Sequence, residues 1–168
     1  MDEKILIVDD EENILKTCQR VLLEERYSCT VFSSPTKALK AAKRINPAVV
    51  ISDQRMPGMT GIEFLENIKK RLPEAVRVIM TGYADINVAI SAINRGQVFR
   101  FIKKPWDDEL FKLEIRHAVE NYRMTQRLQK SLSGMNKNKA IEKERLQGVL
   151  EMAGAVCHEF AQPLQVIS

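Results

Sequence analysis

Five short apolar segments alternate along the chain with longer segments in which apolar residues recur every three or four positions. The apolar segments are residues 5–8, 29–32, 49–51, 76–80 and 98–102. The first and the third are almost unbroken runs of branched hydrophobic residues, which are typical of strands covered on both faces. Alternation of strands and helices predicts an α/β fold, in which a five-stranded parallel sheet carries helices on both faces.

The segments between the predicted strands have the i, i+3, i+4, i+7 spacing of amphipathic helices. Their apolar faces are formed by Ile14, Cys18, Val21 and Leu22; by Ala38, Leu39, Ala42 and Ile45; by Ile62, Leu65, Ile68 and Leu72; and by Ile86, Ala89, Ile90 and Ile93. Ser34 and Pro35 predict a helix start, with the serine as the cap. Leu72 before Pro73 predicts a helix end, because the residue before a proline disfavours the helical conformation.

The pattern changes after Trp106, because no further strand follows. Asp107 or Asp108 can cap a helix that continues into the C-terminal part of the chain. The segment SLSGMNKN, residues 131–138, contains the weakest helix formers of this part. It is therefore either a hinge or a weak point in one long helix.

A seam of residues at alternating spacings of four and three begins at Leu128. The seam consists of Leu128, Leu132, Met135, Lys139, Glu142, Leu146, Val149, Ala153, Val156 and Phe160. One interpretation is an amphipathic helix that packs on its own domain. We favour a coiled coil with a second copy of the chain, and hence a homodimer, because the segment is long and no other domain remains to cover it.

The composition is that of an ordinary globular protein, with 45% hydrophobic and 29% charged residues among 168. The net charge of +4 is mild and does not require a nucleic-acid partner, although Lys and Arg gather after Lys112. The three cysteines are far apart and form no CxxC motif, which favours a reducing, cytoplasmic location over disulfides or zinc. No apolar run approaches about 18 residues, so we expect no membrane partner.

Polar residues with complementary chemistry stand at the ends of the predicted strands. They are Asp9 and Asp10 after the first strand, Asp53 after the third, Thr81 after the fourth and Lys104 after the fifth. The carboxyl ends of parallel strands meet at one edge of a sheet, where ligands bind in such folds. We therefore expect these side chains to converge. The alternative is that acidic residues at strand ends only keep the loops hydrated. This alternative could explain Asp9 and Asp10 alone, but it does not explain why all five residues stand at the ends of four different strands.

This set of side chains suits phosphoryl transfer. Carboxylates held close together repel one another, and a divalent cation relieves the repulsion. Mg²⁺ prefers oxygen ligands and is usually held by one or two carboxylates together with phosphate oxygens. A carboxylate such as Asp53 can attack a phosphoryl group and form an acyl phosphate. The transition state carries negative charge on three oxygens, which Mg²⁺ and Lys104 would neutralise and the Thr81 hydroxyl would contact.

Four segments resemble the receiver domain of bacterial response regulators: ILIVDDE, VVISDQRMPGMTGIEFL, VIMTGYAD and FRFIKKPWDDEL. The resemblance covers about residues 3–125 and implies a flavodoxin-like fold. It also implies that Asp53 is phosphorylated and that the domain catalyses its own phosphoryl transfer and dephosphorylation. The implied Mg²⁺ ligands are Asp9, Asp10, Asp53 and the backbone carbonyl of Arg55.

The resemblance further implies that Thr81 and Lys104 contact the phosphoryl group and that the Lys104–Pro105 bond is cis, a conformation common only before proline. Phe101 matches the aromatic switch residue, which enters the space that Thr81 vacates on moving toward the phosphate. The alternative is that Phe101 is only a core residue. Three residues that flank the site would tune the lifetime of the phosphate: Gln54, Arg55 and Tyr83.

A second resemblance lies near the end of the chain, where AGAVCHEFAQPLQVIS is similar to the H-box of sensor histidine kinases. It implies that His158 is a phosphoacceptor, that Glu159 assists as an acid or base, and that Gln162 positions water for dephosphorylation. Ala161 departs from the Asn often found before this Gln-Pro-Leu. The alternative is that His158 is a solvated histidine on an exposed helix face.

These observations predict three parts of the chain. Residues 1–125 form the receiver domain, residues 126–150 a helical linker that pairs as a coiled coil, and residues 151–168 part of the dimerisation and phosphoacceptor helix of a histidine kinase. The glycines form no GxG pair, so we expect no ATP-binding domain within these residues. We expect the chain to be the front of a longer protein, a receiver that leads into a histidine kinase. A natural short protein is the less favoured alternative.

Three functions follow from this organisation. In the first, phosphorylation of Asp53 by a sensor histidine kinase or a phosphotransfer protein changes the receiver surface and the attached helix. In the second, Asp53 and His158 exchange a phosphoryl group in a phosphorelay. In the third, which we favour least, the basic residues 137–145 bind DNA. That segment also contains Glu142 and Glu144, and alternating charges usually mark a solvated helix face.

Overall fold

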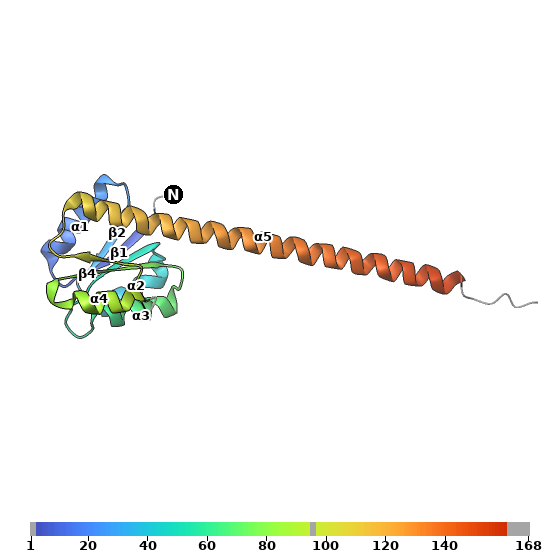
Figure 1. Ribbon diagram of the computed structural model, residues 1–168, viewed down its shortest axis with the longest axis horizontal. Helices are drawn as coiled ribbons and strands as arrows, with labels where there is room; N and C mark the ends of the chain where they lie inside the picture. Colours follow the sequence, from blue (N-terminus) through green and yellow to red (C-terminus); the bar gives the residue numbers. More distant parts are fainter. Residues whose placement is uncertain (1–2, 95–96, 161–168) are drawn as a thin grey trace, which may run out of the picture. The chain divides into compact units, whose positions relative to one another are not determined.

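The computed structural model describes residues 3–94 and 97–160, with side chains up to residue 152. The chain divides into two compact units, Met1–Thr125 and Gln126–Ser168. The first unit contains a five-stranded parallel sheet with the strand order β2-β1-β3-β4-β5 (Figure 1). This is the flavodoxin-like arrangement that the sequence predicts.

All five predicted strands are present. They are β1 (Lys4–Val8), β2 (Ser28–Phe32), β3 (Val49–Asp53), β4 (Val76–Thr81) and β5 (Arg100–Lys103). The fifth strand begins later than predicted, since Val98 and Phe99 precede it. Phe99 nevertheless donates its backbone N–H to the Arg77 carbonyl at 2.7 Å, so the chain already lies beside β4 before the regular pairing begins.

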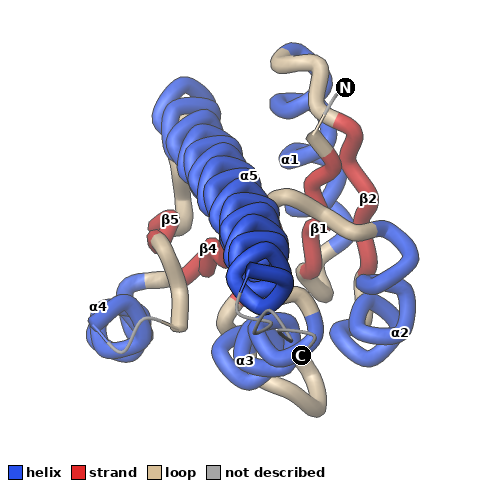
Figure 2. The backbone as a smooth tube through the Cα atoms, turned by 90° about the vertical axis from the view of Figure 1, so that its right-hand side faces the viewer, coloured by secondary structure: helices blue, strands red, loops and turns tan. Residues whose placement is uncertain are grey.

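The helices cover both faces of the sheet. They are α1 (Glu12–Glu24), α2 (Pro35–Ile45), α3 (Gly61–Arg71), α4 (Ile86–Asn94), which follows the 3₁₀ helix η1 (Tyr83–Asp85), and α5 (Asp108–Phe160). The strand order changes direction at β1. Right-handed connections therefore bring α1 and the start of α5 to one face and α2, α3 and α4 to the other (Figures 1 and 2).

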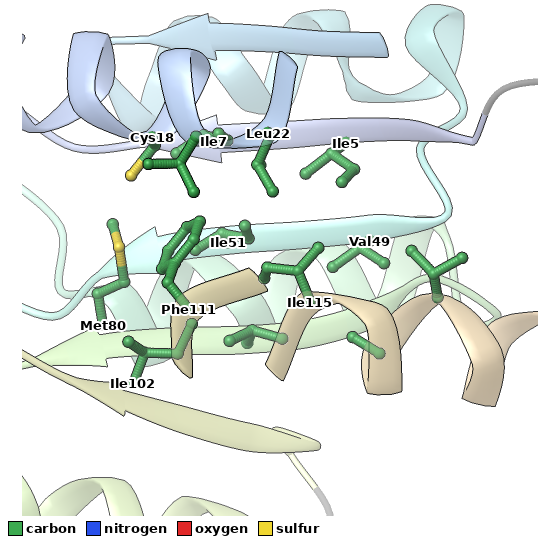
Figure 3. Packing of buried hydrophobic residues seen from close by; sticks show 14 of the residues in the cluster. Ile5, Ile7, Cys18, Leu22, Val49, Ile51, Met80, Ile102, Phe111 and Ile115 are labelled. Carbon is green, nitrogen blue, oxygen red and sulfur yellow. The ribbon is translucent and has the colours of Figure 1, made fainter. Parts of the chain in front are cut away.

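The first face of the sheet packs against α1 and the start of α5. Phe111 and Ile115 of α5 are fully buried and lie over Ile51 in the middle of the sheet (Figure 3). The α1 residues in this cluster are Leu15, Cys18, Val21 and Leu22. Burying a side chain of this size contributes about 1.5–3 kcal/mol, so the start of α5 is an integral part of the receiver core.

The second face is covered by α2, α3 and α4. Alternate strand residues point to it, among them Leu6, Val8 and Val50, because successive side chains on a strand face opposite sides. Phe64, Leu65 and Ile68 supply the α3 contribution. Burial of the strands on both sides explains why the first and third apolar segments show no polar alternation.

Helix ends are set by local side-chain contacts. The Ser34 hydroxyl accepts a hydrogen bond from the Lys37 backbone N–H at 3.5 Å, and Thr60 forms a reciprocal capping box with Glu63 at the start of α3. Of the two candidates for the last helix, Asp107 is the cap. Its Oδ1 accepts from the backbone N–H groups of Glu109 and Leu110 at 3.0 and 3.1 Å.

Two predicted helix faces differ from the observed ones. In α1, Leu15 is buried and Ile14 only half-buried. In α4, the buried residues are Ala89 and Ala92, whereas Ile90 is 43% exposed, so its assignment to the core-facing side was wrong. The physical reason is that α4, with the sequence INVAISAIN, is apolar around most of its circumference, and spacing alone cannot select one face of such a helix.

The second unit is helical as far as residue 160, and α5 continues through Gly134 without interruption. Of the two alternatives for residues 131–138, the hinge is not observed, and the segment is part of one long helix. The apolar seam residues of this unit with described side chains are all more than half exposed: Leu128, Leu132, Met135, Leu146 and Val149. Within residues 3–94 and 97–160, no helix combines the length and the apolar character needed to cross a membrane.

Candidate functional site

The predicted site residues lie along the carboxyl edge of the sheet. Asp9 directly follows β1, Asp53 is the last residue of β3, Thr81 is the last residue of β4, and Lys104 follows β5. Strand pairing places Asp53 opposite Met80 and Thr81 opposite Lys103. The Lys104 backbone N–H also donates to the Thr81 carbonyl at 2.8 Å, which holds the lysine beside the fourth strand.

The lysine ammonium joins two of the carboxylates. Lys104 Nζ lies 2.7 Å from Asp9 Oδ2 and 2.6 Å from Asp53 Oδ1. The Asp9 side chain is completely buried, and the Asp53 and Lys104 side chains are 9% and 19% exposed. The structure therefore brings Asp9, Asp53 and Lys104 together from three different strand ends.

The electrostatic balance of this cluster leaves a negative excess, because one ammonium serves two buried carboxylates. Burial raises the pKa of Asp9 above its ordinary value, and the hydrogen bond from Lys104 offsets this only in part. Burial acts to lower the pKa of Lys104, but the hydrogen bonds to Asp53 and Asp9 outweigh it and raise that pKa. The lysine therefore stays charged, and the site can accommodate further positive charge.

Backbone donors complete the contacts of both carboxylates. The Arg55 N–H donates to Asp53 Oδ2 at 2.6 Å, and the Glu11 N–H donates to Asp9 Oδ1 at 2.9 Å. In each case the donor lies two residues after the carboxylate, so the loop that follows the strand folds back over it. Asp53 thus has one oxygen on Lys104 and the other on the backbone, which fixes the orientation of its carboxyl group.

The predicted cluster of three carboxylates is not formed. Asp10 is exposed, whereas the preceding Asp9 is buried, because neighbouring residues at the end of an extended strand point to opposite sides. Among the residues that the structure describes, no group of three or more His, Cys, Asp or Glu side chains is arranged to hold a metal ion. A site made of all three aspartates would require Asp10 to turn inward.

A Mg²⁺ site of the usual composition nevertheless fits these residues. Mg²⁺ needs only one or two carboxylates when water and phosphate oxygens supply the remaining ligands. Asp9 and Asp53 provide two carboxylates with a net negative excess, and both are hard oxygen donors. The candidate ligands on this chain are therefore Asp9 and Asp53, with Asp10 at the rim and the Arg55 carbonyl in the following loop.

The two predicted switch residues occupy different surroundings. Thr81 is fully buried, and its hydroxyl donates to the Gly82 carbonyl at 3.2 Å. Phe101 lies on β5 opposite Ile79 and is half-buried against the second core cluster. Thr81 therefore lies at the carboxyl edge of the sheet, whereas Phe101 lies two residues before the end of β5. The Lys104–Pro105 bond is cis, as the resemblance implies.

Two residues close to Asp53 had no assigned structural role in the sequence interpretation. Gln54 is buried, and its Oε1 accepts from the Ile62 N–H at 3.3 Å, which ties the end of β3 to the start of α3. Gly61 approaches the same strand so closely that a Cβ atom there would lie 2.1 Å from the Asp53 carbonyl oxygen. The only sequence signal for Gly61 is its place directly after the cap Thr60.

Residues next to the cluster in the sequence make an ionic and an aromatic contact. Arg55 Nε and Nη2 donate to Asp85 Oδ2 and Oδ1 at 2.5 and 3.2 Å. Lys103 Nζ lies 3.4 Å from the centre of the Tyr83 ring, which is a cation–π arrangement. Asp85 was not among the predicted site residues, because nothing in the sequence connects it with Arg55.

The second predicted site lies in the last part of the chain. His158 and Glu159 are in α5, but their side chains lie outside the described residues. Gln162 lies wholly outside them. Their predicted roles remain expectations from the sequence.

Comparison with known proteins identifies close similarity in the first unit. Residues 5–116 match the family described as the response regulator receiver domain. The hydrogenase transcriptional regulatory protein HoxA of Cupriavidus necator is 39% identical over 116 residues, which are 69% of this chain and 24% of that protein. The DNA-binding transcriptional regulator NtrC of Klebsiella pneumoniae is 39% identical over 121 residues, which are 71% of this chain and 25% of that protein.

The solved structures include a response regulator receiver domain protein from Clostridium thermocellum. It is 30% identical with a TM-score of 0.69, and the match covers 73% of this chain and 98% of that one. The chain spans about a quarter of the length of the curated relatives it matches. The similarity therefore concerns the unit that carries Asp9, Asp53 and Lys104.

Proposed function

This chain belongs to the response regulator receiver domain family, and from that premise we propose that Asp53 accepts a phosphoryl group in two-component signal transduction. The donor would be a sensor histidine kinase or a phosphotransfer protein. The single observation that carries the proposal is the position of Lys104 Nζ, within 2.7 Å of both Asp9 and Asp53. This contact places a permanent positive charge where a phosphoryl group on Asp53 would develop negative charge.

The proposed step transfers one phosphoryl group. A carboxylate oxygen of Asp53 attacks the phosphorus atom, a P–O bond forms, and the P–O or P–N bond to the leaving group breaks and its electron pair departs with that group. With acetyl phosphate the leaving group is acetate. In the later dephosphorylation, water attacks the phosphorus atom, the bond between phosphorus and the Asp53 oxygen breaks, and inorganic phosphate and the free carboxylate are released.

The residues of this chain would have distinct roles in the transfer. Lys104 would neutralise the incoming oxygens, and the Thr81 hydroxyl would turn from the Gly82 carbonyl toward them. Phe101 would follow Thr81 and alter the surface near β5. A Mg²⁺ ion held by Asp9 and Asp53, with Asp10 and the Arg55 carbonyl nearby, would neutralise further charge on the phosphoryl oxygens.

We expect incubation with Mg²⁺ and acetyl phosphate to add one phosphoryl group to the native chain. The adduct should require Mg²⁺ and should be absent from Asp53→Asn, because an amide cannot form the acyl phosphate. Intact-mass spectrometry measures it directly. Asp108→Asn is a matched control, since Asp108 pairs with Arg20 on the surface. An adduct of equal yield in Asp53→Asn would place the phosphoacceptor elsewhere.

We also propose that the second unit conveys the phosphorylation state as a paired helix. The support is an exposed apolar seam on an uninterrupted helix, consistent with residues 126–150 as a coiled coil linker. Replacing Leu146 with lysine should shift the chain from dimer to monomer in sedimentation experiments. Lys143→Ala, which lies off the seam, should leave the dimer intact. A native chain that is monomeric at high concentration would contradict this proposal.

A relay to His158 is a second candidate function, with residues 151–168 as part of a kinase dimerisation helix. The observation that favours it is that α5 extends from the receiver core to Phe160 and so includes His158 and Glu159. A phosphoryl adduct that survives alkali but not acid, and that is lost in His158→Gln, would support the relay. An adduct confined to Asp53 would exclude it under those conditions.

DNA binding is the third candidate, and the similarity to the DNA-binding transcriptional regulator NtrC favours it more than the sequence does. The matched family segment ends at residue 116, ahead of the basic residues 137–145. On α5 these residues are exposed and are interleaved with Glu142 and Glu144. Retention on DNA that falls steeply with added salt would support this candidate, because phosphate contacts release counterions.

A further inference from the structure

An ion pair involves Arg55, the second residue after the candidate phosphoacceptor Asp53. The Arg55 guanidinium makes two hydrogen bonds to the Asp85 carboxylate, at 2.5 and 3.2 Å. The two side chains differ in exposure: Arg55 is 71% exposed, whereas Asp85 is 19% exposed. The Asp85 carboxylate is thus the more buried partner, and the Arg55 guanidinium is the more accessible one.

The two residues belong to segments that meet only in the folded chain. Arg55 is the second residue after Asp53, and its backbone N–H already contacts the Asp53 carboxylate. Asp85 ends η1 and directly precedes α4. The ion pair therefore connects the loop that carries the phosphoacceptor with the start of α4.

Few other contacts hold the start of α4. The buried residues of the helix are Ala89 and Ala92, which are small, and η1 has no buried residue. Tyr83 is 72% exposed and is contacted by Lys103. Because η1 and the start of α4 bury little apolar area, we expect loss of this bidentate ion pair to be detectable in the local stability of the segment.

The charge of the phosphoacceptor reaches the guanidinium. The hydrogen bond with Asp85 is the main cause that raises the pKa of Arg55, and the charge of Asp53 adds to it. Phosphorylation would replace one carboxylate charge by a group of about −1.5 to −2 with three acceptor oxygens. Arginine binds such groups through two parallel hydrogen bonds, with the same geometry that it uses for Asp85.

We propose that Arg55 is a positioning residue for the phosphorylated state and that Asp85 competes for it. In the unphosphorylated chain the guanidinium is bound to Asp85 and holds η1 and the start of α4. A phosphoryl group on Asp53 draws the guanidinium to its own oxygens, and Asp85 is released. The ion pair is therefore a latch whose opening is coupled to phosphorylation, and it rests on the proposed function of Asp53.

If the ion pair acts as this latch, substitutions of Asp85 and of Arg55 should change the rate of phosphorylation in opposite directions. Asp85→Asn removes the competing charge and should increase the rate of adduct formation from acetyl phosphate about two- to five-fold, the range available to an exposed ion pair. Arg55→Gln should decrease the rate. In the double variant the Asp85→Asn change should have no effect, because no guanidinium remains to be released. Arg55→Lys, which keeps the charge but not the bidentate geometry, should be intermediate.

A second measurement follows the η1 and α4 segment itself, in the variants without a phosphodonor and in the native chain with and without phosphorylation. Hydrogen exchange of residues 83–94 should be faster in Asp85→Asn and in Arg55→Gln than in the native chain, and phosphorylation of the native chain should produce the same acceleration. Arg20→Gln breaks the exposed pair between Arg20 and Asp108 and is the matched control. It should change neither the rate of adduct formation nor the exchange of this segment.

The outcomes separate the latch from the function on which it rests. If the native chain forms no adduct, the proposed function and the latch both fail. If an adduct forms at Asp53 but Asp85→Asn has the native rate, or has the same effect with and without Arg55, the latch fails and the proposed function stands. A rate increase that requires Arg55, together with faster exchange of residues 83–94, supports the latch.

Discussion

Replacing Lys104 with methionine is expected to slow phosphorylation of Asp53 by acetyl phosphate about 10²–10³-fold, the usual cost of removing one preorganised charge donor from a transition state. Methionine has a similar length and no charge, so the change isolates the ammonium. In the native chain this group lies 2.6 Å from Asp53 Oδ1. Time courses of intact mass at fixed Mg²⁺ measure the rate.

The same substitution is expected to destabilise the fold by about 3 kcal/mol. Removing one partner of a buried ion pair leaves uncompensated charge, which costs about 3–5 kcal/mol. We expect the lower end of this range, because burial already raises the pKa of Asp9 and that group can take up a proton. Urea unfolding at neutral pH without Mg²⁺ measures the loss. Adding Asp9→Asn to Lys104→Met should recover part of it, since one buried carboxylate is removed.

Lys103→Met is the matched control for Lys104→Met. Lys103 is adjacent in sequence and half-buried, but its Nζ lies over the Tyr83 ring rather than between the two aspartates. We expect it to change stability by less than about 1 kcal/mol and to leave most of the phosphorylation rate intact. If Lys103→Met slowed phosphorylation as much as Lys104→Met, the site would depend on positive charge in general and not on the contact of Lys104 with both aspartates.

Replacing Gly61 with alanine is expected to destabilise the receiver by about 3 kcal/mol, in the upper range for inserting a methyl group into packed surroundings. The added Cβ would lie 2.1 Å from the Asp53 carbonyl oxygen and 2.9 Å from its carbonyl carbon. These are backbone atoms at the end of β3 and cannot rotate away. Either α3 or the strand end must therefore move, and urea unfolding measures the cost.

This displacement should also reduce phosphorylation, because the strand end that moves carries the Asp53 side chain. Gly148→Ala is the control, since a Cβ at that position of α5 would have no atom within 4 Å apart from its chain neighbours and the nearby backbone of the helix itself. Alanine is the better helix former by about 1 kcal/mol, so this control should not destabilise the chain. If Gly61→Ala were as stable as the native chain, the close approach of α3 to β3 would not be required for folding.

Much of the fold could be predicted from local patterns. The residues 5–8 and 49–51 are apolar without alternation because both faces of a central parallel strand are covered. Ser34 caps α2, and Leu72 ends α3, because these effects depend on neighbours a few residues away. The α4 face could not be predicted, since Ile90 and Ala92 are both apolar and only packing against the sheet distinguishes them.

The sequence by itself determined which side chains stand at the carboxyl edge of the sheet, because the parallel direction of the strands follows from their alternation with helices along the chain. Only the tertiary structure decided how they meet: Lys104 between Asp9 and Asp53, Asp10 turned outward, and Gly61 against the Asp53 carbonyl. It also decided the pairing of Arg55 with Asp85, which lie 30 residues apart. The spacing of apolar residues indicates on which side of its own helix or strand a residue lies. Contacts between helices and strands depend instead on how separate segments pack in three dimensions.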